Sequence, residues 1–292
     1  MIPDVWYVLY RVKHTHRGLM ADEALLLHVI CDYKIGGMEF GEIINRLQHH
    51  LETPHGVRIH PTEVPPLDTM GVGFVTAQYA FAPHKGRMVI YGNAAPRRGS
   101  SKATKNNQDQ GIKYARLKNG VEIVNVNSEF AFGFVKSEIV EFRNISCPDS
   151  GSQFRSRDFF PERVANILDG KKEILTEELS IADIPEIPHN LISWTDGFGN
   201  IKTTMRKSDL DAMGFQSGQS VQVILNGVSM VGIVATGGFS VDRGVLAVNI
   251  GSSGYADPFV EFFLRVHHMS EKTAAVRFDY PAGGTPFEIR AL

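Results

Sequence analysis

The sequence predicts an α/β domain followed by a small all-β domain. The first half alternates short apolar runs with helical periodicity, the second half consists of β-type runs between glycines, and a charged stretch with two prolines separates them. We therefore expect an amino-terminal domain at 1–169, a linker at 170–190 and a carboxy-terminal domain at 191–292. The first domain should hold a mainly parallel sheet in α/β/α layers, and the second a small β-barrel.

The first domain is predicted from a change of period along the chain. Residues 24–31 (ALLLHVIC) form an apolar run typical of a strand buried on both faces. Phe40–Leu51 carries apolar residues three and four positions apart, which places them on one face of a helix. A strand at Val57–His60, a helix at Thr69–Ala82 and a strand at Arg87–Tyr91 continue the alternation. Residues before position 24 form an extra lead segment.

The rest of the first domain carries turn and cap signals. Residues 99–111 are polar and small, as in a surface loop. Tyr114–Leu117 and Val121–Val126 flank an Asn-Gly step, which predicts a hairpin with a two-residue turn. A helix should open with Asp158 as its cap and end at Gly170.

The second domain is predicted to be built almost entirely of strands. Only Lys207–Met213 indicates a short helix. Five short β-type runs alternate with glycine-rich turns: Ser220–Leu225, Met230–Ala235, Val245–Asn249, Phe259–Val266 and Ala274–Phe278. Short strands at this spacing are typical of a small barrel or sandwich.

Composition excludes several classes of protein. Of 292 residues, 43% are hydrophobic and 21% charged, which is typical of globular rather than disordered chains. A net charge of −2 gives no support for nucleic-acid binding through phosphates. The apolar runs fall short of the about 20 residues that span a bilayer, and the amino terminus does not resemble a secretory signal. Two distant cysteines form no metal or disulfide motif, so we expect a soluble cytoplasmic protein without a metal.

Three segments carry groups suited to chemistry. Asp32 ends the first predicted strand, where open α/β sheets bind ligands and a carboxylate can accept hydrogen bonds from sugar hydroxyls. A turn or capping aspartate is the alternative, and spacing alone favours it. SQFRSRD at 152–158 places two arginines and a hydroxyl before a helix amino terminus, which suits an anion or a nucleophilic oxygen. An exposed basic turn explains the same residues equally well.

The third segment is WTDGFGN at 194–200, where a glycine-bearing turn brings a carboxylate and an amide together. The carboxylate suits an ammonium group, and the amide offers a donor and an acceptor to a purine edge. An ordinary β-turn is the alternative. The paired histidines, by contrast, lack the spacing of metal ligands.

Together these segments resemble the S-adenosylmethionine hydrolases (hydroxide adenosyltransferases) and the related adenosyl halogenases. The resemblance runs from about Leu25 to the carboxyl terminus. Its most specific elements are DGFGNIKTT at 196–204 and LAVNIGSSGY at 246–255. HPTEVPPLD at 60–68 and FRSRD at 154–158 are further matches, and all of them follow the order of the family.

The resemblance implies an α/β/α domain, a β-barrel domain and a homotrimer. Its sites lie between the first domain of one subunit and the second domain of a neighbour. The implied reaction is an in-line displacement at the ribose C5′ of S-adenosylmethionine, in which water releases methionine and leaves adenosine. S-adenosylmethionine is the substrate, and no other cofactor, nucleic acid or membrane partner is implied.

Matched positions give the expected roles of individual residues. Asp32 corresponds to the ribose-binding aspartate, Asp196 to the position that holds the methionine ammonium, and Asn200 to the one that reads adenine. The substrate-binding set is Asp32, Phe154, Asp196, Phe198, Asn200 and Ser252. The catalytic set, which shapes the nucleophile pocket, is Tyr91, Arg98, Arg155 and Ser156.

The sequence departs from the family pattern at the positions that orient the attacking nucleophile. Hydrolases orient water with an aspartate, an arginine and a histidine, whereas Tyr91 and Arg155 stand at the first and last of these positions. Ser156 and Tyr91 are halogenase-like, but the halide-lining threonine aligns with Ala94. Because arginine stays protonated, water must be oriented rather than deprotonated, and turnover should depend weakly on pH between about 6 and 9.

Two other functions remain open. The first is a non-catalytic binder of S-adenosylmethionine or a related nucleoside, since two matched catalytic positions differ from those of the hydrolases. The second is a binder of a purine nucleoside with an anionic tail, which Arg155 and Arg157 could accept.

Overall fold

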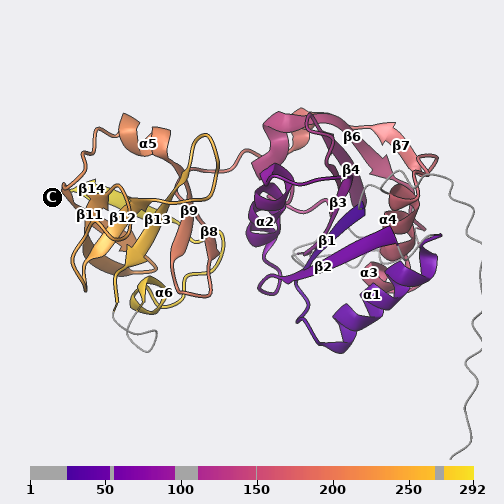
Figure 1. Cartoon of the computed structure of the whole chain (residues 1–292), viewed down its shortest axis with the longest axis horizontal. Helices are drawn as coiled ribbons and strands as arrows, with labels where there is room; N and C mark the ends of the chain where they lie inside the picture. Colours follow the sequence, from indigo (N-terminus) through magenta and orange to yellow (C-terminus); the bar gives the residue numbers. More distant parts are fainter. Residues whose placement is uncertain (1–24, 53–55, 96–110, 149, 267–272) are drawn as a thin grey trace, which may run out of the picture.

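The structure is a computed structural model that describes residues 25–52, 56–95, 111–148, 150–266 and 273–292. Two domains lie side by side along the longest axis of the molecule, each built on a seven-stranded sheet (Figure 1). The predicted lead segment and nearly all of the predicted loop at 99–111 lie outside the described residues. Among the residues described, no helix combines the length and the apolar character needed to cross a bilayer.

The first sheet has the strand order β2-β1-β3-β5-β4-β6-β7. Its strands are β1 (Leu25–Cys31), β2 (Val57–Glu63), β3 (Met88–Asn93), β4 (Ile112–Leu117), β5 (Glu122–Val126), β6 (Ile139–Ile145) and β7 (Leu175–Glu178). The pairs β1–β2, β1–β3 and β3–β5 are parallel, whereas β4–β5, β4–β6 and β6–β7 are antiparallel. The sheet is therefore mixed, which corrects the prediction of a mainly parallel sheet.

A tight loop between β4 and β5 explains why these two strands are antiparallel. The amide of Leu117 donates to the carbonyl of Val121 (2.9 Å), and Gly120 closes the loop at a φ of 88°. A connection this short can only reverse the chain. The predicted hairpin is present, but its loop has three residues with glycine in the left-handed conformation. β7 lies inside the segment that the sequence assigns to the linker and pairs with β6.

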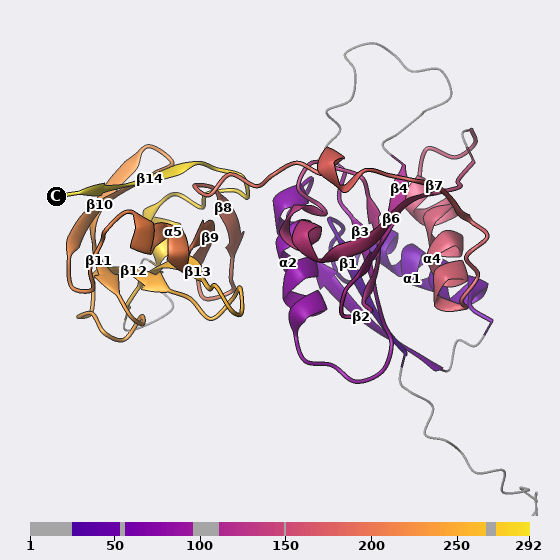
Figure 2. The same ribbon diagram turned by 90° about the horizontal axis from the view of Figure 1, so that it is seen from above.

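Helices cover both faces of this sheet. Figure 2 shows α1 (Met38–His50) and α4 (Phe160–Leu168) on one side, and α2 (Thr69–Phe81) on the side of the second domain. The apolar side of α1 packs with that of α4 against β1, β3 and β5. α2 and the 3₁₀ helix η3 (Gly133–Glu138) bury their side chains against the opposite face. The periodicity at 40–51 thus predicts the buried face of α1.

The cap of α4 differs from the prediction. Asp158 is the last residue of a separate short helix, α3 (Arg155–Asp158), and its carboxylate accepts hydrogen bonds from Arg157. Phe159 occupies the N-cap position of α4, so Asp158 does not cap it. The predicted end at Gly170 is confirmed, because this glycine takes a φ of 79° and its amide donates to a carbonyl in the last turn (3.0 Å).

The second sheet curls but does not close fully. Its order is β14-β10-β11-β12-β13-β9-β8. The strands are β8 (Ile192–Thr195), β9 (Ile201–Arg206), β10 (Ser220–Leu225), β11 (Val228–Ala235), β12 (Leu246–Ile250), β13 (Phe259–Leu264) and β14 (Phe287–Ala291). The edge strands β8 and β14 approach each other, and an isolated bridge between Leu191 and Pro286 joins their flanks. The predicted barrel is therefore a curled, partly closed sheet.

Two short helices accompany the second sheet. α5 (Lys207–Ala212) confirms the helix expected at 207–213. The run at 274–278, predicted as a strand, forms α6 (Ala274–Arg277) instead. Thr273 explains the difference, because its hydroxyl accepts a hydrogen bond from the amide of Val276 (3.4 Å) and caps the helix.

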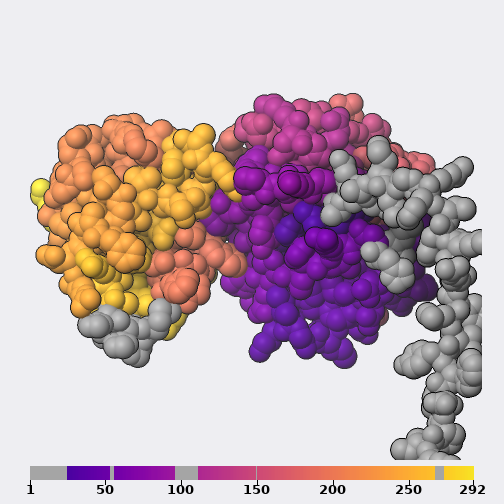
Figure 3. All heavy atoms as spheres, in the orientation of Figure 1, coloured from indigo at the N-terminus to yellow at the C-terminus, as the bar shows by residue number. Residues whose placement is uncertain are grey.

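Aromatic side chains join the two domains. Phe259 of β13 packs against Phe74 of α2 and Phe134 of η3, with ring centroids 5.5 and 5.9 Å apart. The hydroxyl of Tyr255 donates to the carbonyl of Gln78 (2.6 Å). The space-filling view shows the domains meeting along a narrow strip (Figure 3).

Candidate functional site

The switch point of the first sheet lies between β1 and β3. The chain passes from β1 through α1 to β2 on one side, and then through α2 to β3 on the other side of β1. In open α/β sheets, ligands bind outside the carboxyl ends of the strands at such a reversal. Asp32 directly follows β1, and its amide donates to the carbonyl of Asn93 at the end of β3 (3.2 Å).

The Asp32 carboxylate binds the loop that follows β2. Its Oδ2 accepts a hydrogen bond from the amide of Leu67 (3.1 Å). Leu67 has a φ of 63°, a left-handed conformation that is rare for a bulky side chain and is typically retained at functional sites. Asp32 does not cap α1, whose N-cap residue is Gly37. Asp32 is therefore not the cap of α1, whereas the turn half of the alternative stands, because Asp32 lies in a bend and holds a loop amide at the switch point.

Tyr33 brings the short helix α3 to the same place. Its hydroxyl lies 3.0 Å from the hydroxyl of Ser156, and its ring meets the edge of the Phe154 ring at a centroid distance of 5.8 Å. Ser156 is buried. Burial raises the pKa of Tyr33, although the hydrogen bond with Ser156 opposes the shift. Ser156 and Phe154 thus lie beside the residue that follows Asp32.

Tyr91 lies in β3, with none of its surface exposed. Its hydroxyl has no hydrogen-bond partner among the described residues. Burial, followed by the charges of Cys31 and Tyr33, raises the pKa of Tyr91 far above its ordinary value. A buried hydroxyl of this kind can take a hydrogen bond from a water or a ligand, and it stays protonated while it does so. We define Asp32, Tyr33, Tyr91, Phe154 and Ser156 as the first candidate site.

Arg155 is buried against residues close to it in the sequence. Its Nη1 donates to the carbonyl of Pro148 (2.8 Å), and its guanidinium lies 5.5 Å from the ring centroid of Phe159. Its Nε is buried without a partner in the described part of the chain. Arg98 lies outside the described residues.

The turn between β8 and β9 holds the other predicted group. Asp196 Oδ1 accepts hydrogen bonds from the amides of Phe198 (2.9 Å) and Asn200 (3.0 Å), and Oδ2 accepts from Asn200 Nδ2 (3.0 Å). Asp196 and Asn200 are therefore adjacent, as predicted, and they also form the β-turn of the alternative interpretation. Phe198 is 68% exposed at the tip of this turn, and Ser252 is exposed after β12.

A lysine that sequence reasoning missed completes this group. Lys202 Nζ lies 3.6 Å from Asp196 Oδ2 and 3.0 Å from Glu261 Oε2. We define Asp196, Asn200, Lys202 and Glu261 as the second candidate site. A signal was present, because Glu261 interrupts the otherwise apolar run FVEFFL.

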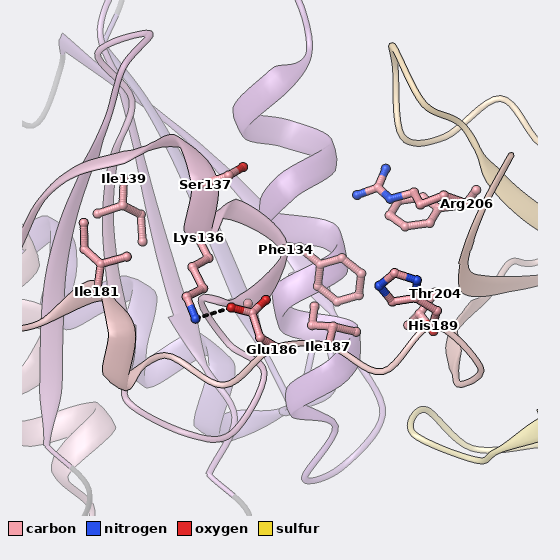
Figure 4. A pocket seen from close by; sticks show the side chains of 12 residues that line it. Phe134, Lys136, Ser137, Ile139, Ile181, Glu186, Ile187, His189, Thr204 and Arg206 are labelled. Atoms are coloured by element: carbon pink, nitrogen blue, oxygen red, sulfur yellow. Dashed lines mark hydrogen bonds and ion pairs between the residues drawn. The ribbon is translucent and has the colours of Figure 1, made fainter. Parts of the chain in front are cut away.

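The two candidate sites lie in different domains. The first surrounds the end of β1 in the first sheet, and the second lies on β9, β13 and the turn before β9 in the second sheet. A groove of about 510 Å³ does lie between the domains, but none of the predicted site residues lines it. Figure 4 shows its walls, where Phe134 and Ile187 face Arg206 and the Lys136–Glu186 ion pair lies to one side.

Metal binding has no support in the described residues, since no group of three or more His, Cys, Asp or Glu side chains there is arranged to hold an ion. Cys31 and Cys147 are both free thiols.

Comparison with known proteins shows the fold only. The structure resembles that of an uncharacterized conserved protein from Thermotoga maritima, with a TM-score of 0.68, 17% identity, and coverage of 90% of this chain and 99% of that one. It also resembles a conserved hypothetical protein from Thermus thermophilus, with a TM-score of 0.58, 14% identity, and coverage of 91% and 99%. No protein-family model and no curated protein matches the sequence. The two-domain arrangement therefore recurs in other proteins.

Proposed function

We propose that this chain binds S-adenosylmethionine and displaces its methionine with water, giving adenosine and methionine. The observation that carries the proposal is the gathering of Asp32, Tyr91 and Ser156 around the switch point between β1 and β3. The family resemblance selected these three residues from distant parts of the sequence. A ribose-binding carboxylate beside buried hydroxyls suits the binding and the attack that the reaction needs.

Each group has a role in the proposed displacement. Asp32 accepts hydrogen bonds from the ribose hydroxyls, while Ser156 and Tyr91 hold a water in line with C5′. The water oxygen forms a bond to C5′ as the C5′–S bond breaks. The electron pair of that bond stays on sulfur and neutralises the sulfonium, and the water proton is released to solvent. Arg155 does not contact the water in this proposal; it holds Pro148 and Phe159 in place through its hydrogen bond and its ring contact.

The second candidate site completes the binding pocket in this proposal. Asp196 and Asn200 face the methionine and adenine ends of the ligand, as the resemblance implies. Because the two candidate sites lie in different domains, and because the resemblance implies sites shared between subunits, we propose that they meet between copies of the chain in a homotrimer. The layered first domain and the curled second sheet support the α/β/α-plus-barrel architecture that accompanies such an assembly.

Binding without turnover is the second candidate function. It is favoured by Arg155, which matches a water-orienting position but donates to the Pro148 carbonyl. A nucleoside with an anionic tail has less support, because Arg157 is already engaged by Asp158 and Glu42.

Calorimetry combined with an adenosine-release assay tests the proposal. The unaltered chain should bind S-adenosylmethionine and release adenosine and methionine in equal amounts. Asp32→Asn should weaken binding by about 10-fold or more, because it removes a charged acceptor. Asp211→Asn, on the exposed α5, serves as the matched control. Binding without product favours the second function, and absence of both refutes both functions.

A further inference from the structure

A row of polar side chains crosses the second sheet on one face. Lys202 of β9 is paired in register with Glu261 of β13, and Glu261 is paired with Asn249 of β12. Directly paired residues on antiparallel strands place their side chains on the same face. The neighbouring residues Val248 and Val260 belong to the apolar core on the opposite face. The row is therefore separate from the packing core.

The charges in this row alternate. Lys202 lies between Glu261 and Asp196, with Nζ–O distances of 3.0 and 3.6 Å. Their side chains are largely buried, at 15%, 9% and 22% exposure respectively. Ion pairs withdrawn from water rarely stabilise a fold more than apolar residues of similar size. An ordered row of negative, positive and negative groups is therefore more than the fold requires.

Two buried polar side chains, one in the row and one in the loop after β12, carry oxygens without partners among the described residues. Asn249 is 7% exposed, and its Oδ1 accepts no hydrogen bond from any described residue. Ser253, which is 9% exposed, has a hydroxyl without a partner in the described part of the chain, in the loop after β12. An unsatisfied buried polar atom costs about 1–3 kcal/mol, so such atoms indicate a missing polar partner.

The backbone at Gly251 approaches the Glu261 carboxylate closely. A Cβ at Gly251 would lie 2.8 Å from Glu261 Oε2 and 3.0 Å from the carbonyl of Phe259. Any larger residue would displace the carboxylate from its place beside Lys202. Glycine at position 251 thus preserves the geometry of the row.

We propose that Lys202 and Glu261 recognise the zwitterionic α-amino acid group of the ligand. Lys202 binds its carboxylate, and Glu261 acts with Asp196 on its ammonium. An amino acid presents one positive and one negative group on adjacent atoms, which complements the alternating charges of the row. Asn249 and Ser253 accept the remaining ammonium hydrogens. This inference rests on the proposed function and adds residues that determine specificity.

The affinities of three nucleosides distinguish the contribution of the ligand carboxylate from that of its ammonium. S-adenosylmethionine carries both charges of the amino acid, its decarboxylated form lacks only the carboxylate, and methylthioadenosine lacks the whole amino acid group. Calorimetry measures their affinities for the unaltered chain, Lys202→Met, Lys202→Arg and Glu261→Gln. Lys207→Met is the matched control, because Lys207 is exposed on α5 and pairs only with Asp211 among the described residues. Circular dichroism and thermal unfolding check that each variant is folded.

We expect Lys202→Met and Glu261→Gln each to lose affinity selectively for the charged group that the altered residue binds. Lys202→Met should reduce the preference for S-adenosylmethionine over its decarboxylated form by about 10-fold, while methylthioadenosine binding changes little. Lys202→Arg should retain the preference. Glu261→Gln should weaken both ammonium-bearing ligands relative to methylthioadenosine.

Other outcomes overturn the inference in distinguishable ways. If Lys202→Met weakens all three ligands equally, or leaves the preference intact, Lys202 does not read the carboxylate. If Glu261→Gln leaves the ratio of affinities unchanged, Glu261 does not read the ammonium. If the unaltered chain binds methylthioadenosine but shows no preference for an amino acid group, the inference fails while nucleoside binding stands. If it binds none of the three, the proposed function fails and the inference falls with it.

Discussion

The hydroxyl of Tyr33 lies 3.0 Å from the hydroxyl of Ser156, although 123 residues separate them in the sequence. This contact joins the end of β1 to the start of α3. Two hydroxyl groups from distant parts of the chain therefore meet beside Asp32, and their contact can be tested directly.

Ser156→Ala should reduce adenosine release by about 10-fold or more, because the proposed water loses one of its orienting groups. Tyr33→Phe removes the other partner of the hydrogen bond. In a double-mutant cycle on unfolding free energy, the pair should show a coupling of about 1 kcal/mol. Ser229→Ala is the control, since the Ser229 side chain bonds only to Gln222 on the exposed side of β11 among the described residues. Loss of stability without loss of turnover would assign Ser156 a structural role.

Activity should vary little with pH between about 6 and 9. Burial raises the pKa of both Tyr33 and Tyr91, so neither hydroxyl ionises in that range. Arginine does not titrate there either. We expect kcat/KM for adenosine release to change less than about 3-fold across the range once substrate ionisation is taken into account. A single sharp ionisation near pH 7 would identify a general base and contradict this assignment.

The sequence predicts those elements whose burial follows a regular local pattern and fails for those that depend on distant residues. The 3.6-residue period of Phe40, Ile43 and Leu47 fixes the buried face of α1, because only one side of that helix is apolar. The run at 274–278 misleads, since a short, mostly apolar stretch such as AAVRF suits a strand or a helix equally. The sequence does not predict β6, because its buried residues Ile139, Phe142 and Ile145 recur at every third position instead of alternating as in a typical strand. Its place depends on pairing with β4, which no local pattern contains.

The candidate site is predictable only in part for a related reason. A carboxylate after a buried strand can be placed at the sheet edge from the sequence, and Asp32 lies there. Tyr33 cannot be assigned a role in this way, because its partner Ser156 comes from a distant helix. Lys202 and Glu261 likewise depend on the register between β9 and β13. Sequence reasoning thus finds residues within one segment and misses those that meet through tertiary structure.

Glu122→Gln should destabilise the first domain by about 2–3 kcal/mol. The buried Glu122 carboxylate accepts hydrogen bonds from Arg87 Nε and from the hydroxyl of Tyr114, both at 2.7 Å, and pairs with Lys172. Burial alone raises its pKa, but the hydrogen bonds from these three groups outweigh burial and lower it. Urea unfolding at pH 7 measures the effect.

The control for Glu122 is an exposed pair on the same sheet. Glu141→Gln removes the partner of the more exposed Arg116 (3.1 Å) and should cost less than about 1 kcal/mol. If both variants lose the same free energy of unfolding, the buried network around Glu122 stabilises the domain no more than a surface ion pair does.

His28 should make the stability of the first domain depend on acid pH. Its ring stacks between Tyr79 (4.2 Å) and His60 (5.2 Å), and burial followed by the charges of His60 and His84 lowers its pKa to about 4. Above about pH 6.5 the imidazole is neutral in the folded and unfolded chain alike. Between about pH 6.5 and about 4 only the unfolded chain takes up this proton, so the free energy of unfolding falls as the pH falls.

His28→Phe should remove this contribution, because phenylalanine can stack on Tyr79 but binds no proton. We expect the loss of stability from about pH 7 to about pH 4.5 to be smaller in the variant by about 1–2 kcal/mol, as measured by urea unfolding at each pH. His49→Gln, at the exposed end of α1, controls for removal of a histidine elsewhere. If His28→Phe and the unaltered chain lose stability in parallel across this range, His28 takes up its proton equally in both states and its stacked position does not lower its pKa.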